Sequence, residues 1–453
     1  MSLFPETAET SMTVAEPFSV PFHLAGNYRP VTEERTAFDL PVSGKLPTEL
    51  YGTFLRNGPN PLDPSPHWFL GEGMVHGVRL EDGGATWSRN RWVRTASFTD
   101  GLAFLDEHGQ RNLVSSKANT SVIRHAGRIL ALVETSLPYE LTDELETLGP
   151  WDFGGRLATA MTAHPKVCPT TGEMHFFGYD YAPPYATYHV VDATGRLATS
   201  RALEMPGPTM MHDFNLTERF VVFMDLPIVF DLSLAMGGSP LPYCYDASYG
   251  ARLAVVRRDD PHGEVRWFDI DPCYVFHALN AHDDGEVITI DVARLDSPSI
   301  DRTGNLDAVL WRWRVDLTTG TVTERQLDDR PGDLPRVDDR LTGLPADRGW
   351  ITSMPDPTDV GGSGAITVYD LARGTSRTHQ FQDGRVPGEA VFAPADARPG
   401  GPGWLLSYVY DPARDASDIV VLDSDRPDDK AVATIHLPAR VPYGFHGSWL
   451  ASD

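Results

Sequence analysis

Cysteine is scarce in this chain, and long apolar runs are missing. Cys168, Cys244 and Cys273 are an odd number without CxxC spacing, which argues against a disulfide framework or a cysteine zinc site. No segment approaches the roughly 18 uninterrupted apolar residues of a membrane span. The first residues, MSLFPETAETSMTVAEP, lack the basic and apolar regions of a signal peptide. We therefore expect a cytoplasmic protein with reduced thiols.

Cationic residues are also few. The chain has 38 Lys and Arg against 63 Asp and Glu, a formal charge of −25. Nucleic acid and anionic membrane surfaces both need clustered cations, so neither is expected as the main partner. The charge itself is typical of a solubility device.

Helical patterns are rare, whereas short strand patterns recur along the chain. The best helical segment is residues 136–149, with acidic residues near its start and Gly149 as a stop signal. VLWRWRVDL (309–317), a TTG turn and TVTERQL predict a hairpin, and residues 365–380 repeat that arrangement. Gly (40) and Pro (37) are plentiful, as many turns require. These features favour an all-β protein, and its length favours a β-propeller, although no sequence period is visible. We expect a flexible arm over residues 1–25 and a single domain over residues 26–453.

Four histidines stand far apart, each in a short motif that resembles the edge of a strand. They are His164 in AHPK, His212 in MMHDF, His277 in FHALNA and His446 in FHGSW. Most single histidines are surface residues or hydrogen-bonded core residues. These four have small or apolar neighbours, where an unpaired imidazole would cost on the order of a few kcal/mol. In a propeller the inner strands face one axis, so four of them could present imidazoles to one ion.

The ligand type limits the metal. Imidazole suits iron, copper, nickel or zinc, and a structural zinc site would more often use cysteine. Ferrous iron with four ligands keeps positions open for dioxygen and substrate. Each ligand needs a partner for its other ring nitrogen. Glu134 and Glu389 lie in apolar stretches and are candidates, although either alone would more simply be a strand-end or turn acid.

Several motifs in order resemble the carotenoid cleavage oxygenase family, which includes the retinal-pigment-epithelium isomerase and the lignostilbene dioxygenases. They include GNYRPVTEERTAFDLPVSGKLPTELYGTFLRNGPNP (26–61), WFLGEGMVHGVRL (68–80), ANTSVIRHAGRILALVE (118–134), TAHPKVCPTTGEMHFFGY (162–179) and VPYGFHGSWL (441–450). The resemblance runs almost end to end. It implies a seven-bladed β-propeller with a loop and helical cap over the iron face.

The resemblance also implies a site. Ferrous iron would be held by the four histidines, with Glu134, Asp333 and Glu389 behind His212, His277 and His446 respectively. His164 would have no carboxylate. Thr120 matches a residue near the open iron position in relatives.

Two departures from the family pattern bear on chemistry. Asp333 stands where relatives usually have Glu, so its contact with His277 is expected to be long, bridged by water or absent. Stilbenoid-cleaving relatives have a Lys at the position of Val133, and Lys117 is nearby but offset. An apolar Val favours a polyene.

The resulting hypothesis is an Fe(II) dioxygenase that uses O2 to cleave a C=C bond of a carotenoid or apocarotenoid into carbonyl products. The alternatives are a stilbenoid-cleaving dioxygenase, an isomerohydrolase, and a non-catalytic propeller that binds an apolar ligand. The expected partner is an apolar small molecule. Weak peripheral membrane contact and the oligomeric state are left open.

Overall fold

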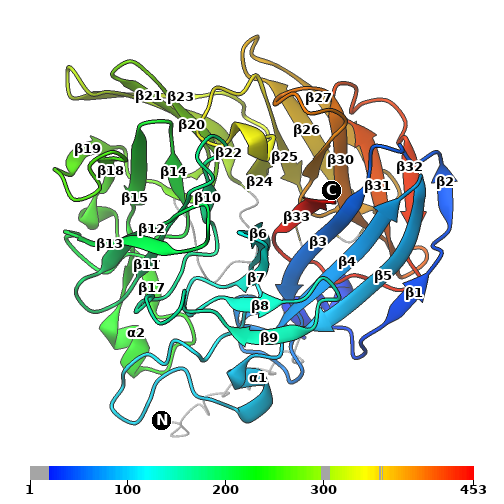
Figure 1. Ribbon diagram of the computed structural model, residues 1–453, viewed down its shortest axis with the longest axis horizontal. Helices are drawn as coiled ribbons and strands as arrows, with labels where there is room; N and C mark the ends of the chain where they lie inside the picture. Colours follow the sequence, from blue (N-terminus) through cyan, green and yellow to red (C-terminus); the bar gives the residue numbers. More distant parts are fainter. Residues whose placement is uncertain (1–19, 297–306, 357–358, 360, 453) are drawn as a thin grey trace, which may run out of the picture.

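The computed structural model describes residues 20–296, 307–356, 359 and 361–452. In these ranges the strands form seven sheets arranged as blades around a centre, plus one separate two-stranded ribbon (Figure 1). The predicted β-propeller is therefore confirmed. Each blade is named below after the first strand given for it.

Three consecutive blades each have four antiparallel strands. The β6 blade contains β6 (Ser121–His125), β7 (Arg128–Leu132), β8 (Tyr139–Leu141) and β9 (Thr147–Pro150). The β10 blade contains β10 (Lys166–Val167), β11 (Met174–Tyr179), β12 (Ala186–Val191) and β13 (Leu197–Leu203). The β14 blade contains β14 (Phe214–Leu216), β15 (Phe220–Asp225), β18 (Ala251–Arg257) and β19 (Arg266–Ile270).

Two further blades have the same form. The β20 blade contains β20 (Tyr274–Asp284), β21 (Val287–Leu295), β22 (Val309–Asp316) and β23 (Thr321–Gln326). The β24 blade contains β24 (Asp333–Arg336), β25 (Arg348–Ser353), β26 (Ala365–Asp370) and β27 (Thr375–Gln380). The β22–β23 and β26–β27 hairpins confirm the two hairpins predicted from alternation.

Segments from both ends of the chain complete the last two blades. The β28 blade contains β28 (Val386–Pro387), β29 (Val391–Pro394), β30 (Gly403–Asp411), β31 (Ala416–Asp423), β32 (Ala433–His436) and β2 (Val42–Gly44). The β33 blade contains β33 (Gly447–Ala451), β3 (Gly52–Pro59), β4 (Gly73–Glu81), β5 (Gly84–Trp92) and β1 (Thr36–Phe38). Because β33 pairs with β3, the two ends of the chain are joined in one sheet and the ring is closed.

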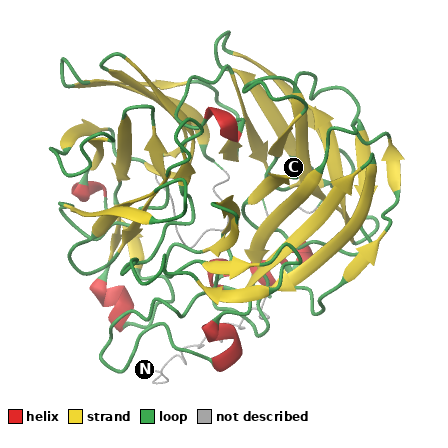
Figure 2. Ribbon diagram, viewed as in Figure 1, coloured by secondary structure: helices red, strands yellow, loops and turns green. Residues whose placement is uncertain are grey.

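Helices are few and short (Figure 2). The α-helices are α1 (Ala96–Asp100) and α2 (Leu232–Met236). The 3-10 helices are η1 (Phe22–Leu24), η2 (Gly26–Tyr28), η3 (Trp68–Leu70), η4 (Ala247–Tyr249) and η5 (Asp339–Leu341), and the ribbon is β16 (Ile228–Phe230) with β17 (Tyr243–Tyr245). Residues of α1, η3, α2 and the ribbon line one cavity together with loop residues, and these segments are called the cap below. None of the helices in the described ranges has the length and apolar character needed to cross a bilayer.

The helix predicted over residues 136–149 is wrong, because this segment supplies β8 and β9 at the outer part of a blade. Tyr139 is fully buried and its hydroxyl donates to the Val114 carbonyl oxygen at 2.7 Å. Leu145 adopts a left-handed φ of 65° in the turn between the two strands. Pairing with β7 and burial of Tyr139 override the local acidic pattern.

The predicted arm lies largely outside the described residues, which begin at residue 20. His23 is buried, and its Nε2 lies 2.9 Å from the Ser65 carbonyl oxygen. Residues before 26 therefore already contact the rest of the protein, at the loop that precedes η3.

The core lies between the blades. A large cluster joins the β10, β14 and β20 blades and includes Tyr188, Phe223, Tyr274 and Trp313, all fully buried. Packed β-sheets of this kind give the inner strand ends little freedom, so side chains at the centre hold fixed positions.

Candidate metal centre

Four different blades contribute one histidine each to the centre of the ring. His164 and His212 lie two residues before β10 and β14, His446 immediately precedes β33, and His277 lies within β20. The pairing of β20 with β21 shifts register between Val275 and Ala278, and irregularities of this kind re-aim a side chain. The four motifs are therefore brought together by the closure of the propeller.

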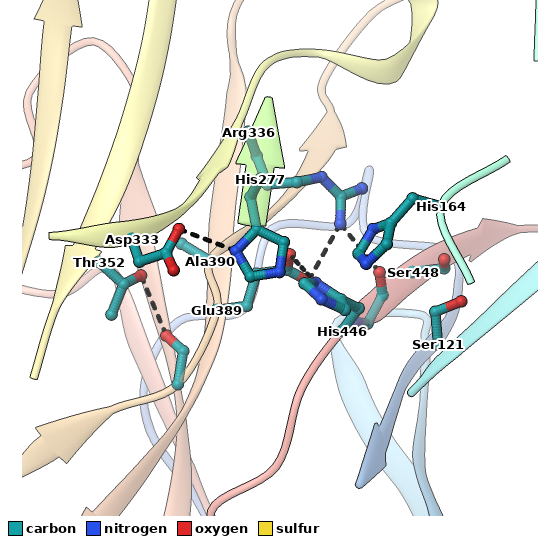
Figure 3. A network of polar contacts seen from close by, with 12 residues as sticks. Ser121, His164, His277, Asp333, Arg336, Thr352, Glu389, Ala390, His446 and Ser448 are labelled. Carbon is teal, nitrogen blue, oxygen red and sulfur yellow. Dashed lines mark hydrogen bonds and ion pairs between the residues drawn. The ribbon is translucent and has the colours of Figure 1, made fainter. Parts of the chain in front are cut away.

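The ring nitrogens of the four histidines converge. One ligand atom from each residue lies within 4.8 Å of the others. His164 Nε2 and His212 Nε2 are 3.0 Å apart, and the His164 and His446 ring centroids are 4.5 Å apart. Figure 3 shows His164, His277 and His446 turned toward one point. Ligands about 2 Å from one ion have spacings of this size.

Hydrogen bonds to the main chain fix three of these segments. The Thr162 hydroxyl accepts a hydrogen bond from the His164 amide and donates one to the His212 carbonyl oxygen, both at 3.2 Å. The His446 amide donates to the Thr120 carbonyl oxygen at 3.1 Å. The histidines are thus held in place by neighbouring blades.

The other three blades each contribute a carboxylate that contacts the Nδ1 atom of one histidine. His212 Nδ1 lies 2.6 Å from Glu134, which follows β7. His277 Nδ1 lies 2.8 Å from Asp333, and His446 Nδ1 lies 2.9 Å from Glu389. Among the described residues no carboxylate contacts His164. A carboxylate on Nδ1 fixes the ring so that Nε2 faces inward as a lone pair.

The Asp333 contact corrects one expectation. A side chain shorter than Glu led us to expect a long, water-bridged or missing contact, yet the hydrogen bond is direct. The start of β24 is irregular: the register against β25 shifts between Asp333 and Arg336, and Leu334 has a φ of 54°. This backbone brings the shorter carboxylate within reach of His277.

Charge distinguishes the four imidazoles. Burial, reinforced by the positive charge that the other three rings would carry if protonated, holds the pKa of His164 well below its usual value. Burial also lowers the pKa of His446, although Glu389 opposes this. At His212 burial lowers the pKa, but the Glu134 carboxylate outweighs it and raises the pKa. Four protonated rings cannot share this space, whereas four neutral rings around one cation can.

This donor set fits a transition metal. Neutral imidazoles suit iron, copper, nickel and zinc, and three outer carboxylates balance the charge of a divalent ion. The three cysteines are free, and none belongs to the cluster.

Two further residues act on this centre and were not found from the sequence. Arg336 Nη1 donates to Glu389 at 3.0 Å and to the Gly447 carbonyl oxygen at 3.1 Å. The Tyr179 hydroxyl donates to Glu134 at 2.7 Å. The only sequence signal for Arg336 is its place three residues after Asp333 in DLPR, and Tyr179 ends an apolar strand without any signal.

His212, His277 and His446 line a cavity of about 730 Å³ beneath the cap. Aromatic side chains form much of its wall: Tyr28, Trp68, Phe69, Phe276 and Phe445. Its size and lining suit a small apolar ligand.

Three residues singled out from the sequence line this cavity: Thr120, Val133 and Lys117. Thr120 is buried and its hydroxyl donates to Asn119 Oδ1 at 3.0 Å. Lys117, set aside as offset from the motif, lies in the wall, and its Nζ is 2.6 Å from Glu72. Ser115 and Ser116 of the same segment also line the cavity, a placement that no local sequence signal marks.

Comparisons with known proteins agree with this architecture. The family described as retinal pigment epithelial membrane protein matches residues 28–451. A Mycobacterium tuberculosis protein named carotenoid cleavage oxygenase is 38% identical over 94% of this chain and 97% of its own length. A Pseudomonas brassicacearum lignostilbene dioxygenase structure has a TM-score of 0.86 and 29% identity, covering 96% of this chain and 100% of that one. A cobalt-substituted Synechocystis apocarotenoid oxygenase has a TM-score of 0.83 and 25% identity, covering 93% and 97%. Because the family match covers residues 28–451 of this chain, the chain belongs to the family of retinal pigment epithelial membrane protein and the carotenoid cleavage oxygenases.

Proposed function

We propose that residues 26–453 form an Fe(II) dioxygenase that cleaves a C=C bond of a carotenoid or apocarotenoid into two carbonyl products. The observation that supports this most is the meeting of four imidazoles from four blades, three of which line an apolar cavity. The relative named carotenoid cleavage oxygenase and the apocarotenoid oxygenase structure support the polyene as substrate class.

In this proposal His164, His212, His277 and His446 hold the iron, and the three carboxylates keep each partner ring oriented. Bound ferrous iron supplies the reaction with dioxygen. The cavity aligns one double bond of a long apolar ligand beside the histidines and excludes water. Thr120 borders the side of the centre that opens to the cavity.

The proposal is tested by anaerobic loading with ferrous iron, followed by aerobic incubation with apocarotenals and mass spectrometry of the products. His212→Ala and His446→Ala should each abolish iron binding and cleavage. His108→Ala is the control, because His108 is an exposed loop residue outside the cluster. Cleavage that survives both ligand substitutions would refute the iron site.

A stilbenoid substrate is the second candidate. The lignostilbene dioxygenase structure is similar over the whole chain, and Lys117 places an amine in the cavity wall. Against it, Lys117 is paired with Glu72 and Val133 offers no polar contact. Turnover of a stilbenoid panel beside an apocarotenoid panel separates the two.

We also propose weak contact with a neutral lipid surface at the cavity mouth. Phe104 and Leu105, each 42% exposed, line the cavity on one side, and α2 exposes Met236 (82%) near cavity-lining Ala235. The net charge of −25 disfavours anionic lipid. Co-sedimentation with phosphatidylcholine vesicles should fall in Met236→Glu, and unchanged sedimentation would contradict this contact.

A further inference from the structure

An arginine lies in the wall of the apolar cavity. Arg111 follows the loop after α1, its side chain is only 7% exposed, and it lines the same cavity as His212, His277 and His446. Its guanidinium carbon lies 5.5 Å from the centroid of the Phe104 ring and 5.6 Å from that of Tyr181. The two rings hold the planar cation in place.

The hydrogen-bonding capacity of Arg111 is largely unused. Its Nη1 donates to the Tyr179 carbonyl oxygen at 2.9 Å, and this is its one hydrogen bond among the described residues. Asp180 forms an ion pair with Nη1 at 3.7 Å, which is too long for a hydrogen bond, and Nε is buried without a hydrogen-bond partner. A guanidinium carries five N–H donors and no acceptor. A buried group of this kind is stabilised by any ligand that brings oxygen acceptors.

Lys117 is the other cation in this wall, and its situation differs. Its amine is 2.6 Å from the Glu72 carboxylate and hydrogen-bonds to it, whereas the carboxylate paired with Arg111 is too far away to accept a hydrogen bond. Arg111 is therefore the cation with donors available to a ligand.

Arg111 lies beside a wall of the cavity that is partly exposed to solvent. It forms a β-bridge with Leu105, and Leu105 and its neighbour Phe104 both line the cavity and are each 42% exposed. On the other side, Tyr181 stacks on Phe230 with the ring centroids 5.4 Å apart. The loop after α1 and the β16–β17 ribbon thus frame Arg111 with aromatic rings.

Tyr179 connects this point with the metal centre. Its carbonyl oxygen accepts from Arg111, and its hydroxyl donates to Glu134, which contacts His212. Tyr179 is thus the one residue between the Arg111 guanidinium and the Glu134 carboxylate that contacts His212. A long ligand in the cavity can reach both.

We propose that Arg111 binds the oxygen-bearing end of the substrate and thereby selects apocarotenoids with a carbonyl or carboxylate end over hydrocarbon polyenes. This inference rests on the proposed oxygenase function. Because one end is held at Arg111, the double bond beside the histidines is set by its distance from that end. Arg111 is therefore a specificity residue that also fixes the cleavage position.

The test compares an apocarotenal with a hydrocarbon polyene of the same conjugated length, in the iron-loaded full chain. Arg111→Met should lower kcat/KM for the apocarotenal by roughly 10-fold or more, the size expected for losing hydrogen bonds from a charged donor. The hydrocarbon value should change less than about 2-fold, on the same reasoning. The variant should also cut the apocarotenal at more than one double bond.

Asp106→Ala is the matched control, because Asp106 Oδ1 accepts from the His108 and Gln110 amides in the same loop and is outside the cavity lining. It should leave the preference for the apocarotenal unchanged. Equal losses on both substrates in Arg111→Met, with a single cleavage position retained, would overturn the inference and make Arg111 a loop anchor. If Arg111→Met does not fold, Arg111→Lys decides: it keeps the charge with fewer donors and should lose part of the preference, and full retention overturns the inference.

Binding to the metal-free protein separates this inference from the oxygenase proposal. Quenching of protein fluorescence gives the Kd of each polyene without turnover. If wild-type protein binds the apocarotenal more tightly than the hydrocarbon and Arg111→Met does not, the inference holds even when neither is cleaved. Equal affinities in the wild-type protein overturn it.

Discussion

Glu389 is the most deeply buried carboxylate at the metal centre, and removing its charge should weaken both the fold and metal binding. Its side chain is 1% exposed and accepts from His446 Nδ1 at 2.9 Å, the Gly447 amide at 2.8 Å and Arg336 Nη1 at 3.0 Å. Burial raises its pKa, but Arg336 and His446 outweigh burial and lower the pKa to about 2. It is therefore ionised at neutral pH.

Glu389→Gln keeps the shape of the side chain and removes this charge. Arg336 would then be balanced by Asp339 alone, through two contacts at 2.9 Å. Breaking a buried ion pair costs about 3–5 kcal/mol, and because Asp339 remains we expect about 3 kcal/mol in the free energy of unfolding. Loss of the carboxylate behind His446 should lower metal affinity by roughly 10- to 100-fold.

Two assays measure these effects: urea unfolding of the metal-free protein, and competition for iron or cobalt with a chelator. Asp418→Asn is the matched control, since Asp418 is a buried carboxylate in β31 that also contacts a histidine, His436, and an arginine, Arg385. It should destabilise the fold and leave metal affinity unchanged. If Glu389→Gln binds metal as tightly as the wild-type protein, the role assigned to Glu389 is refuted.

Three other substitutions test separate parts of the structure. Burial lowers the pKa of His189 to about 4, so between pH 6.5 and 4 the unfolded chain binds a proton that the folded chain does not. As the pH is lowered through this range, the free energy of unfolding should therefore decrease by up to about 1.4 kcal/mol per pH unit. His189→Gln should remove this part of the slope in urea unfolding at pH 7 and pH 5, and an unchanged slope would contradict it. A Cβ at Gly73 would lie 2.3–2.7 Å from backbone atoms of residues 117–118, so Gly73→Ala should destabilise the fold by about 1–3 kcal/mol, whereas Gly84→Ala, whose Cβ would meet only an atom at 3.5 Å, should not. Equal midpoints of thermal unfolding would refute that difference. Val133→Lys adds an amine to the cavity wall and should increase turnover of phenolic stilbenoids relative to apocarotenals, and an unchanged ratio would argue against phenol recognition at this position.

Local pattern explains which parts of the fold were predictable. The β22–β23 and β26–β27 hairpins follow from alternation and turn residues within about 20 positions, so the sequence identifies them directly. The prediction for residues 136–149 failed because their acidic residues matched a helix start, whereas pairing with β7 and burial of Tyr139 make the segment part of a sheet. The cysteines gave a clear signal, and all three are free.

At the site, the sequence identified residue chemistry better than contacts. Apolar neighbours mark the four histidines as buried, and burial of an imidazole calls for a partner. The direct bond from His277 to Asp333 could not be foreseen, because it depends on the register shift at the start of β24. Arg336 belongs to the same irregular strand.

By itself the sequence determined the residue types: four imidazoles in apolar motifs, acids able to partner them, and many short strands in a chain too long for one sandwich. Only the tertiary structure decided that seven blades divide these roles, with four supplying histidines and three supplying carboxylates. It also decided that Lys117 is paired while Arg111 keeps unused donors in the same cavity. The physical reason is that residue type fixes what a group can bind, whereas closure of the ring fixes which groups distant in sequence come within reach of each other.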